Sequence, residues 1–320
     1  MSLPPLFDRL RLPVVGAPLF IVSNPDLVIA QCKAGIVGSF PALNARPQSM
    51  VDEWLHQITE ELAAWDRANP DRPSAPFAVN QIVHKSNDRL MQDMATCQKW
   101  KVPIVITSLG AIAEVNDGAH SWGGIVLHDI IHDRFARKAI DKGADGLIAV
   151  ASGAGGHAGP LSPFALVQEI REWFDGPLLL SGSIANGRSI LAAQAMGADL
   201  AYIGSPFVAT REANASEAYK QGIVDGRAAD IVYSNLFTGI HGNYLRGSIV
   251  AAGMDPDNLP PGDVSTMNFE SATGAKAWRD IWGSGQGIGA VKAVEGAGDY
   301  IARLAEEYQA AKTALLATAR

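Results

Sequence analysis

The sequence has only two cysteines, no hydrophobic run long enough to cross a membrane and no excess of basic residues. Cys32 and Cys97 stand outside any CxxC or Cys/His spacing, which argues against a disulfide framework and against a metal site. A transmembrane helix needs about 18 or more consecutive apolar residues, and no such run occurs. Prolines interrupt the N-terminal segment where a signal peptide requires an unbroken apolar stretch. We therefore expect a cytoplasmic protein that does not associate with membranes.

The charge balance argues against a further class of partner. The chain has 26 Lys and Arg against 33 Asp and Glu, a formal net charge of -7, and no basic run. Because nonspecific nucleic-acid binding depends on Lys and Arg that neutralise phosphates, no nucleic-acid partner is expected. Hydrophobic residues make up 48% of the chain and charged residues 18%, which excludes intrinsic disorder. The 32 glycines exceed the usual share and need an explanation of their own.

Short apolar runs alternate with amphipathic segments over much of the chain. Eight runs have the continuous apolar character of strands buried on both faces, and they span Val14–Leu19, Ile36–Phe40, Phe77–Asn80, Ile104–Ser108, Gly124–His128, Gly146–Val150, Leu178–Gly182 and Ala201–Gly204. Helices are predicted between them, at Asp26–Lys33, Met50–Trp65, Asn87–Trp100, Arg134–Lys142, Pro163–Phe174 and Gly187–Met196. The repeated units predict an α/β protein built on a (β/α)8 TIM barrel. A doubly wound sheet is the alternative, and the regularity of the units favours the barrel.

Two joints between a helix and the next strand share one sequence pattern. Gly143 in Lys142–Asp145 and Gly197 in Met196–Asp199 each follow a predicted helix, and Gly35 is a weaker third copy. Glycine in this place is typical of a helix that ends in a left-handed residue. We interpret these three glycines as helix caps.

The regular alternation ends after Arg211. Residues 213–276 begin with a predicted helix at Ser216–Gly226, continue through an irregular stretch at Phe237–Tyr244, and end in a Pro- and Gly-containing linker from Pro256 to Gly274. We interpret residues 213–276 as an inserted lid or substrate domain. Residues 1–212 and 277–320 then form the barrel, with a closing helix through Ala319.

Small residues follow three neighbouring strands at the end of a barrel where active sites form. The loop Ala151–Gly159 contains four glycines, among them Gly155 and Gly156, which allow backbone N–H groups to approach a ligand closely. Ser181-Gly182-Ser183 and Gly204-Ser205 end the last two predicted strands, where barrels commonly bind a phosphate group. No GxxxxGK[ST] or GxGxxG motif occurs at a suitable place, which argues against ATP and against a Rossmann dinucleotide site.

His157 is the histidine that lies in this glycine-rich loop, which makes it the first candidate for a general base. The alternative is a histidine that only hydrogen-bonds a cofactor or caps a turn. His128, followed by Asp129, ends another strand and is the second candidate, and His241 in the predicted lid is the third. Asn80, at the end of its strand, either contacts a flavin ring edge or satisfies loop backbone. Neither cysteine follows a strand next to a base, so a cysteine nucleophile is not expected.

Several segments in the same order along the chain resemble the nitronate monooxygenase family, formerly called 2-nitropropane dioxygenases. The resemblance covers nearly the whole chain and rests on Gly16–Leu19, Ala154–Gly159, Ser181–Arg188, Ile203–Thr210 and Trp282–Gln286. It implies a barrel that holds FMN noncovalently, with the phosphate on backbone groups of Gly182, Ser183, Gly204 and Ser205. It also places Ala17, Pro18, Leu19, Asn80 and Gln286 near the isoalloxazine ring, and we extend the cofactor site to His128, Gly155, Gly156 and Ser181.

The resemblance also implies an activity. His157 matches the histidine that takes a proton from a neutral nitroalkane and positions the nitronate, which is oxidised with O2 to a carbonyl compound and nitrite. Related members carry a lysine where this chain has Asp129 after His128. A carboxylate cannot donate to flavin oxygens as an ammonium group does, so Asp129 bears on substrate preference and on the redox properties of the flavin.

Three other readings are retained as alternatives. An FMN-dependent NAD(P)H reductase, acting on a quinone or an enoyl thioester, would use the same barrel. A barrel of the inosine-monophosphate dehydrogenase type needs a loop cysteine, and neither Cys32 nor Cys97 is placed for that role. A flavin- or phosphate-binding protein without turnover is the third. The expected partners are a small-molecule substrate and O2, and a homodimer is the default expectation for a soluble enzyme.

Overall fold

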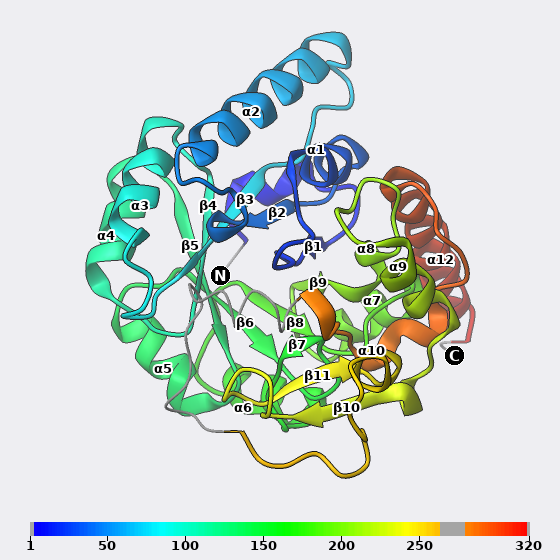
Figure 1. Ribbon diagram of the computed structural model, residues 1–320. Helices are drawn as coiled ribbons and strands as arrows, with labels where there is room; N and C mark the ends of the chain where they lie inside the picture. The colour runs from blue at the N-terminus through cyan, green and yellow to red at the C-terminus, as the bar shows by residue number, and fades with distance from the viewer. Residues whose placement is uncertain (1–2, 263–278, 319–320) are drawn as a thin grey trace.

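Eight parallel strands form a barrel in the computed structural model, which describes residues 3–262 and 279–318 (Figure 1). Their order around the sheet is β1-β9-β8-β6-β5-β4-β3-β2, and an isolated bridge between Val15 and Val37 joins its two edges. The strands are β1 (Val14–Gly16), β2 (Gly38–Pro41), β3 (Phe77–Ile82), β4 (Ile104–Ser108), β5 (Ile125–Ile130), β6 (Gly146–Val150), β8 (Leu178–Ser181) and β9 (Leu200–Ile203). The predicted TIM barrel and all eight of its strands are confirmed, with shifts of a few residues at their ends.

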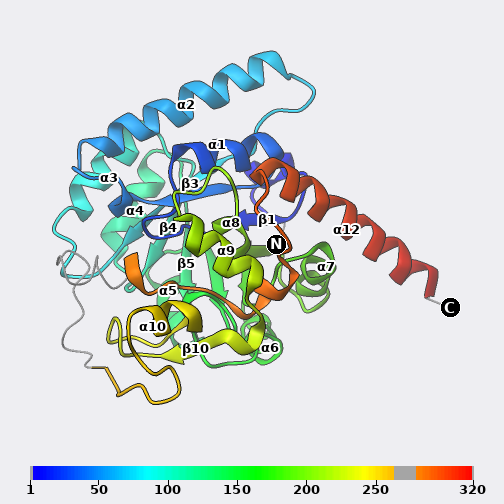
Figure 2. The same cartoon turned by 45° about the vertical axis from the view of Figure 1, so that its right-hand side comes forward.

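Helices surround the barrel on its outside (Figure 1). They are α1 (Pro25–Ala34), α2 (Met50–Ala68), α3 (Leu90–Lys99), α4 (Ala113–Ser121), α5 (Asp133–Asp141), α6 (Pro163–Arg171), α7 (Gly187–Ala195) and the short α8 (Ser205–Val208). The six predicted helices are confirmed, and α4 is one that the sequence pattern did not indicate. Helix α12 (Ala297–Thr318) packs against α1 and α7 and extends beyond the barrel (Figure 2). It is the predicted closing helix, although Ala319 lies outside the described residues.

The hydrophobic core has an inner and an outer layer, separated by the strands. The inner layer fills the barrel with side chains such as Val15, Ile106, Leu127 and Leu179, and it includes Phe7 from the N-terminal segment. The outer layer packs the opposite faces of the strands against the helices. Because both faces of each strand are buried, alternating patterns are absent from the sequence and continuous apolar runs take their place.

The three predicted helix caps have the expected backbone conformation. Gly35, Gly143 and Gly197 have φ angles of 94°, 92° and 110°, in the left-handed region that residues with a Cβ rarely adopt. These glycines serve the fold and not the pocket.

A small antiparallel sheet covers one side of the barrel mouth (Figure 1). It contains β10 (Ile231–Ser234), β11 (Gly242–Leu245) and β7 (Gly156–His157), in the order β10-β11-β7. The prediction of an irregular stretch through Tyr244 is wrong for residues 242–244, because β11 pairs with β7 from a remote part of the chain and no local pattern indicates that pairing. Likewise, β7 lies in what the sequence indicated was a loop.

The segment around this sheet has its own small core. Helix α9 (Glu217–Asp225) confirms the predicted helix, and α10 (Arg246–Ala251) follows β11. Tyr244, Ile249 and Ile281 form a cluster separate from the barrel core. The division into a barrel and an inserted lid at residues 213–276 stays a prediction, and residues 263–276, with most of the expected linker, lie outside the described residues. No helix within residues 3–262 or 279–318 is long and apolar enough to cross a membrane.

Candidate active site

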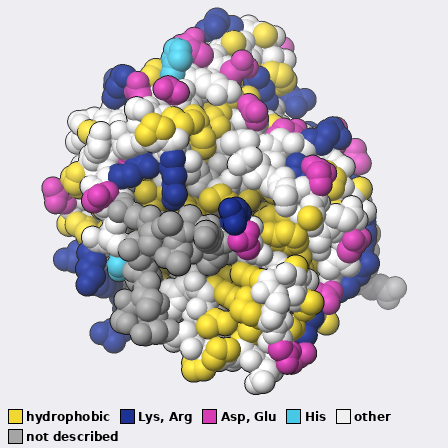
Figure 3. All heavy atoms as spheres, viewed as in Figure 1, with side chains coloured by type: hydrophobic (Ala, Val, Ile, Leu, Met, Phe, Trp, Pro, Cys, Tyr) yellow, Lys and Arg dark blue, Asp and Glu magenta, His cyan; other side chains and the backbone are white. Residues whose placement is uncertain are grey.

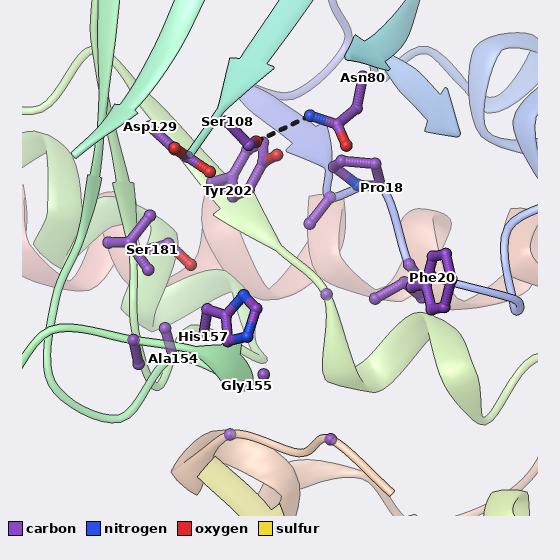
Figure 4. Close-up of a pocket in the computed structure, with 18 of the residues that line it drawn as sticks. Pro18, Phe20, Asn80, Ser108, Asp129, Ala154, Gly155, His157, Ser181 and Tyr202 are labelled. Atoms are coloured by element: carbon purple, nitrogen blue, oxygen red, sulfur yellow. Dashed lines mark hydrogen bonds between the residues drawn. The ribbon is translucent and has the colours of Figure 1, made fainter. Parts of the chain in front are cut away.

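A cavity of about 590 Å³ opens at the carboxyl ends of the barrel strands. This volume is typical of a site for a small molecule or cofactor. Asp129, Ser108, Tyr202 and Asn80 lie on one side of the cavity, whereas His157 lies on the other beside the glycine-rich loop (Figure 4). The barrel supplies the first side and the small sheet supplies the second.

The structure brings nearly all of the predicted site residues to this one cavity. It is lined by Ala17, Pro18, Leu19, Asn80, His128, Gly155, Gly156, His157, Ser181, Gly182, Ser183, Gly204 and Ser205. Gln286 is not among the lining residues, although its neighbours Gly285 and Gly287 are. A methyl group on Gly153 would lie 3.1 Å from the Gln286 side-chain oxygen, so Gln286 lies against the glycine-rich loop. The roles of these residues in cofactor binding stay predictions.

Three loops pack closely together at the cavity. Gly285 N–H donates to Ser205 Oγ at 2.8 Å, and Gln286 N–H donates to the Gly153 carbonyl at 2.9 Å. A Cβ on Gly155 would lie only 2.7 Å from the Gly285 nitrogen. Glycine at position 155 is therefore required by the contact between loops, as well as offering bare backbone to a ligand.

The turns after β8 and β9, where a phosphate is predicted to bind, have an unusual backbone geometry. Gly182 and Ser183 have φ angles of 138° and 58°, and Gly204 precedes the first residue of α8. Ser183 N–H already donates to the Gly153 carbonyl at a long distance of 3.3 Å. The resemblance implies that the Ser183 N–H binds the phosphate, and a bound phosphate would have to compete with the Gly153 carbonyl for it.

His157 lies on β7, where it pairs with Gly242 of β11. Its Nε2 lies 3.0 Å from Thr238 Oγ1 in the connection between β10 and β11. Burial lowers the pKa of His157 to about 4, because a charged imidazolium loses hydration inside the cavity. The ring is therefore neutral at pH 7 and has a lone pair with which to accept a proton.

The other candidate histidines have different surroundings. His128 is buried, and its Nδ1 lies 2.6 Å from Thr107 Oγ1. Burial, with a smaller contribution from Lys138, lowers the pKa of His128 to about 4. His241 is exposed, stacks on Tyr233 with ring centroids 5.0 Å apart and is not among the lining residues. Of the three, His157 combines access to the cavity with a hydrogen-bonded partner from the small sheet.

A chain of hydrogen bonds runs along the barrel side of the cavity. Asn80 Nδ2 donates to Ser108 Oγ at 2.8 Å (Figure 4), and Ser108 and the Leu109 backbone in turn hydrogen-bond the Asp129 carboxylate. Burial nevertheless raises the pKa of Asp129 to about 6. Burial also raises the pKa of Tyr202, and the nearby charge of Asp129 raises it further. This side of the cavity offers hydrogen-bond acceptors and an acid that is ionised at neutral pH.

Three residues at the site are not among those that the sequence predicts. Ser108 and Tyr202 lie at or near the carboxyl ends of strands, so a survey of polar strand-end residues would have found them. Thr238 lies in a stretch without regular pattern, and no sequence signal indicates its contact with His157.

Side chains of both charges are mixed on the face that Figure 3 shows. Lys and Arg side chains are interspersed with Asp and Glu, and hydrophobic side chains gather over β11 and α10. Among the described residues, no group of three or more His, Cys, Asp or Glu side chains is arranged to hold a metal ion.

Comparison with known proteins assigns the family. The family model described as nitronate monooxygenase matches residues 6–256. A nitronate monooxygenase from Paraburkholderia phytofirmans is 26% identical over 300 residues, covering 78% of this chain and 77% of its own. A probable nitronate monooxygenase from Staphylococcus aureus (strain Newman) is 32% identical over 261 residues, covering 71% and 73%.

A solved structure agrees with the fold. Nitroalkane oxidase from Streptomyces ansochromogenes superposes with a TM-score of 0.81 at 23% identity, covering 98% of this chain and all of its own. The match to the family model spans most of the barrel and the whole cavity described above, apart from Gly283, Gly285 and Gly287. The chain therefore belongs to the nitronate monooxygenase family of flavin-dependent oxidoreductases.

Proposed function

We propose that this protein is an FMN-dependent nitronate monooxygenase, which oxidises alkyl nitronates or nitroalkanes with O2 to carbonyl compounds and nitrite. The observation that carries the proposal is a neutral histidine, His157, at a cavity whose opposite side and floor suit a flavin. Membership of the family gives the general activity, and the geometry of this cavity supports the particular roles below.

The lining of the cavity supports FMN as the cofactor. Gly182, Ser183, Gly204 and Ser205 would hold the phosphate through backbone groups at the turns after β8 and β9. A Cβ on Gly204 would meet Leu19 at 3.3 Å and Ala17 at 3.5 Å, so the absence of a side chain lets these two residues lie close to the turn. When bound, the flavin supplies the electron acceptor for the nitronate and the site of reaction with O2.

Asn80 is oriented by its neighbours. Its amide nitrogen donates to Ser108 Oγ and, at 3.2 Å, to the Ile106 carbonyl. The amide oxygen is thereby the group that Asn80 can offer to a donor on the ligand. A flavin ring has one such donor in its pyrimidine N–H, which suits the predicted position of Asn80 beside the ring.

His157 would act on the substrate. With a pKa of about 4 the free ring is a weak base, but proton transfer from a nitroalkane creates a negatively charged nitronate beside it. An adjacent negative charge raises the pKa of an imidazolium, so the ion pair stabilises the product of the transfer. The same contact would hold the nitronate in place for oxidation.

The proposal is tested by mixing the purified yellow protein anaerobically with a nitronate and, separately, with NADH or NADPH, while the flavin absorbance is recorded. We expect bleaching by the nitronate at a rate that supports turnover and no comparable bleaching by either nicotinamide. Under air, nitrite and the carbonyl compound should form together. Bleaching by NAD(P)H alone would instead identify a flavin-dependent reductase of quinones or enoyl thioesters, and no bleaching by any of them would indicate a binding protein.

A further inference from the structure

The hydroxyl group of Thr238 has hydrogen-bond partners on two sides. His157 Nε2 lies 3.0 Å from Thr238 Oγ1. The same hydroxyl donates to the carbonyl oxygen of Ile240 at 3.0 Å. The Ile240 N–H also points back to Thr238 Oγ1 at 3.4 Å. A threonine side chain thus links the candidate base to the connection between β10 and β11.

The number of protons decides which way these bonds run. A carbonyl oxygen can only accept, so the single hydroxyl proton of Thr238 is used on Ile240. The hydroxyl oxygen must then accept from His157, which requires a proton on Nε2. A neutral imidazole carries one N–H, and the lone pair therefore lies on Nδ1.

We propose that Thr238 is a positioning residue that holds His157 in the Nε2-protonated tautomer, so that Nδ1 accepts the proton from the substrate. The part about substrate rests on the function proposed above; the part about the tautomer does not. In this view the small sheet acts on the chemistry through a hydrogen bond, and not only by covering the barrel mouth.

The backbone of the small sheet fixes the two partners relative to each other. His157 pairs with Gly242 in the register of β7 and β11, and Ala158 N–H donates to the His241 carbonyl at 3.2 Å. Gly239 N–H donates to the Asn235 carbonyl at 2.9 Å, which closes the turn that carries Thr238. Thr238 is thus held against His157 from both ends of its turn.

Among the described residues, two tyrosines beside this pair are uncharged near neutral pH. Burial raises the pKa of Tyr244, and hydrogen bonding with Thr238 offsets part of that rise. Burial also raises the pKa of Tyr233, whose hydroxyl donates to the Ala158 carbonyl at 3.1 Å. Since both tyrosines keep their protons, neither competes with His157 as a charged hydrogen-bond acceptor for Thr238.

The experiment is 15N NMR of the purified protein labelled at histidine nitrogens, with the H157Q variant used to assign the His157 signals among the seven histidines. We expect the wild type at pH 7.5 to show a protonated Nε2 and an unprotonated Nδ1. In T238V, which removes the hydroxyl at similar volume, both tautomers should be populated. T238S keeps the hydroxyl and should keep the wild-type pattern.

The same variants have a kinetic readout. T238V should slow turnover of a neutral nitroalkane by about tenfold, within the range for a misplaced catalytic group, while a preformed nitronate is affected less. T238S should restore most of the rate.

A wild-type His157 protonated on Nδ1 would overturn the inference whether or not nitronates are oxidised. An unchanged tautomer and rate in T238V would overturn it as well. Conversely, an Nε2-protonated ring without nitronate oxidation would leave the tautomer assignment standing and refute the proposed function.

Discussion

The barrel and the small antiparallel sheet differ in how they are built and in what they contribute to the site. The eight barrel strands are parallel and buried on both faces, with an inner core that runs from Val15 to Tyr202. The small sheet is antiparallel and has a separate core of Tyr244, Ile249 and Ile281. The barrel forms most of the cavity, whereas His157 lies on the small sheet and Thr238 in the connection between its strands β10 and β11.

This difference in construction indicates different roles for the two regions. A rigid barrel suits a cofactor that must be held in one place, because its walls belong to a large continuous core. A small sheet with its own core can vary in sequence without disturbing the barrel. We infer that the barrel determines flavin binding and that the small sheet determines how the substrate is deprotonated.

The largest effect is expected from H157Q, which removes the candidate base that the small sheet carries. Loss of a general base lowers turnover by about 10²- to 10⁴-fold, while flavin content should stay at the wild-type level. Steady-state oxygen consumption and the flavin absorbance of the purified variant check both statements. H241Q is the matched control, because His241 is exposed and does not line the cavity, and its turnover should change less than about twofold.

Truncation of a buried side chain should destabilise the whole molecule in the barrel core but only the small sheet in the second core. Leu179→Ala in the inner barrel core should destabilise the whole molecule by about 2–5 kcal/mol. Ile249→Ala, also fully buried, should loosen the small sheet first and spare the barrel. Hydrogen exchange read by mass spectrometry would show faster exchange around β10 and β11 in the second variant. Uniformly faster exchange in both variants would mean that the two regions unfold as one unit.

Two glycine-to-alanine substitutions test the packing between the loops at the cavity. Gly155→Ala would place a methyl group 2.7 Å from the Gly285 nitrogen, so backbone must shift, and we expect a cost of about 1–3 kcal/mol with weaker flavin binding. A methyl group on Gly247 in α10 would meet no atom within 4 Å, and Gly247→Ala should be neutral or stabilising by about 0.5–1 kcal/mol. Thermal unfolding and FMN titration measure both, and equal effects would count against the packing argument.

The smallest effect concerns the barrel side, at Asp129. Its folded pKa of about 6 lies above its ordinary value of 3.8, so the folded state binds the proton more tightly than the unfolded state. Stability from this group is therefore present at pH 4 and lost as the pH rises to about 6. Asp129→Asn removes that loss. The free energy of unfolding of the variant should match that of the wild type at pH 4 and exceed it by about 1–2 kcal/mol at pH 7 and above. Thermal unfolding across this range would contradict the account if the difference shrank with increasing pH.

The same variant bears on the cofactor. If the flavin ring lies beside Asn80 as proposed, it also lies near Asp129, because Ser108 hydrogen-bonds both side chains. Removing the negative charge should then favour the reduced flavin, which is the more negatively charged form. The midpoint potential of Asp129→Asn should then lie above that of the wild type at pH 8, with the two values converging toward pH 5. Equal potentials at pH 8 would place the ring away from Asp129.

The barrel could be predicted from the sequence because its signals are local. Strands such as β4 and β6 are continuous apolar runs, and their bounds were predicted to the residue. The caps at Gly35, Gly143 and Gly197 were predicted because a left-handed helix end favours glycine at a fixed place in each unit. Most of the candidate site followed from the rule that the carboxyl ends of barrel strands meet at one mouth.

The small sheet could not be predicted, because it depends on contacts between distant segments. β7 has only two residues and becomes a strand through pairing with β11. Thr238, which hydrogen-bonds His157, lies in a turn whose sequence has no helical or strand period. The hydrogen bond from the Ser183 N–H to the Gly153 carbonyl likewise depends on how two loops meet.

The most direct test compares two substrates in the H157Q variant: a neutral nitroalkane and its preformed nitronate, each at several concentrations, with flavin occupancy measured in the same samples. The nitroalkane needs proton removal and the nitronate does not. The account predicts full flavin occupancy and a loss of nitroalkane turnover at least about tenfold greater than the loss with the nitronate. Equal losses with both substrates, or loss of the flavin itself, would contradict the assignment of His157 as the base held by the small sheet.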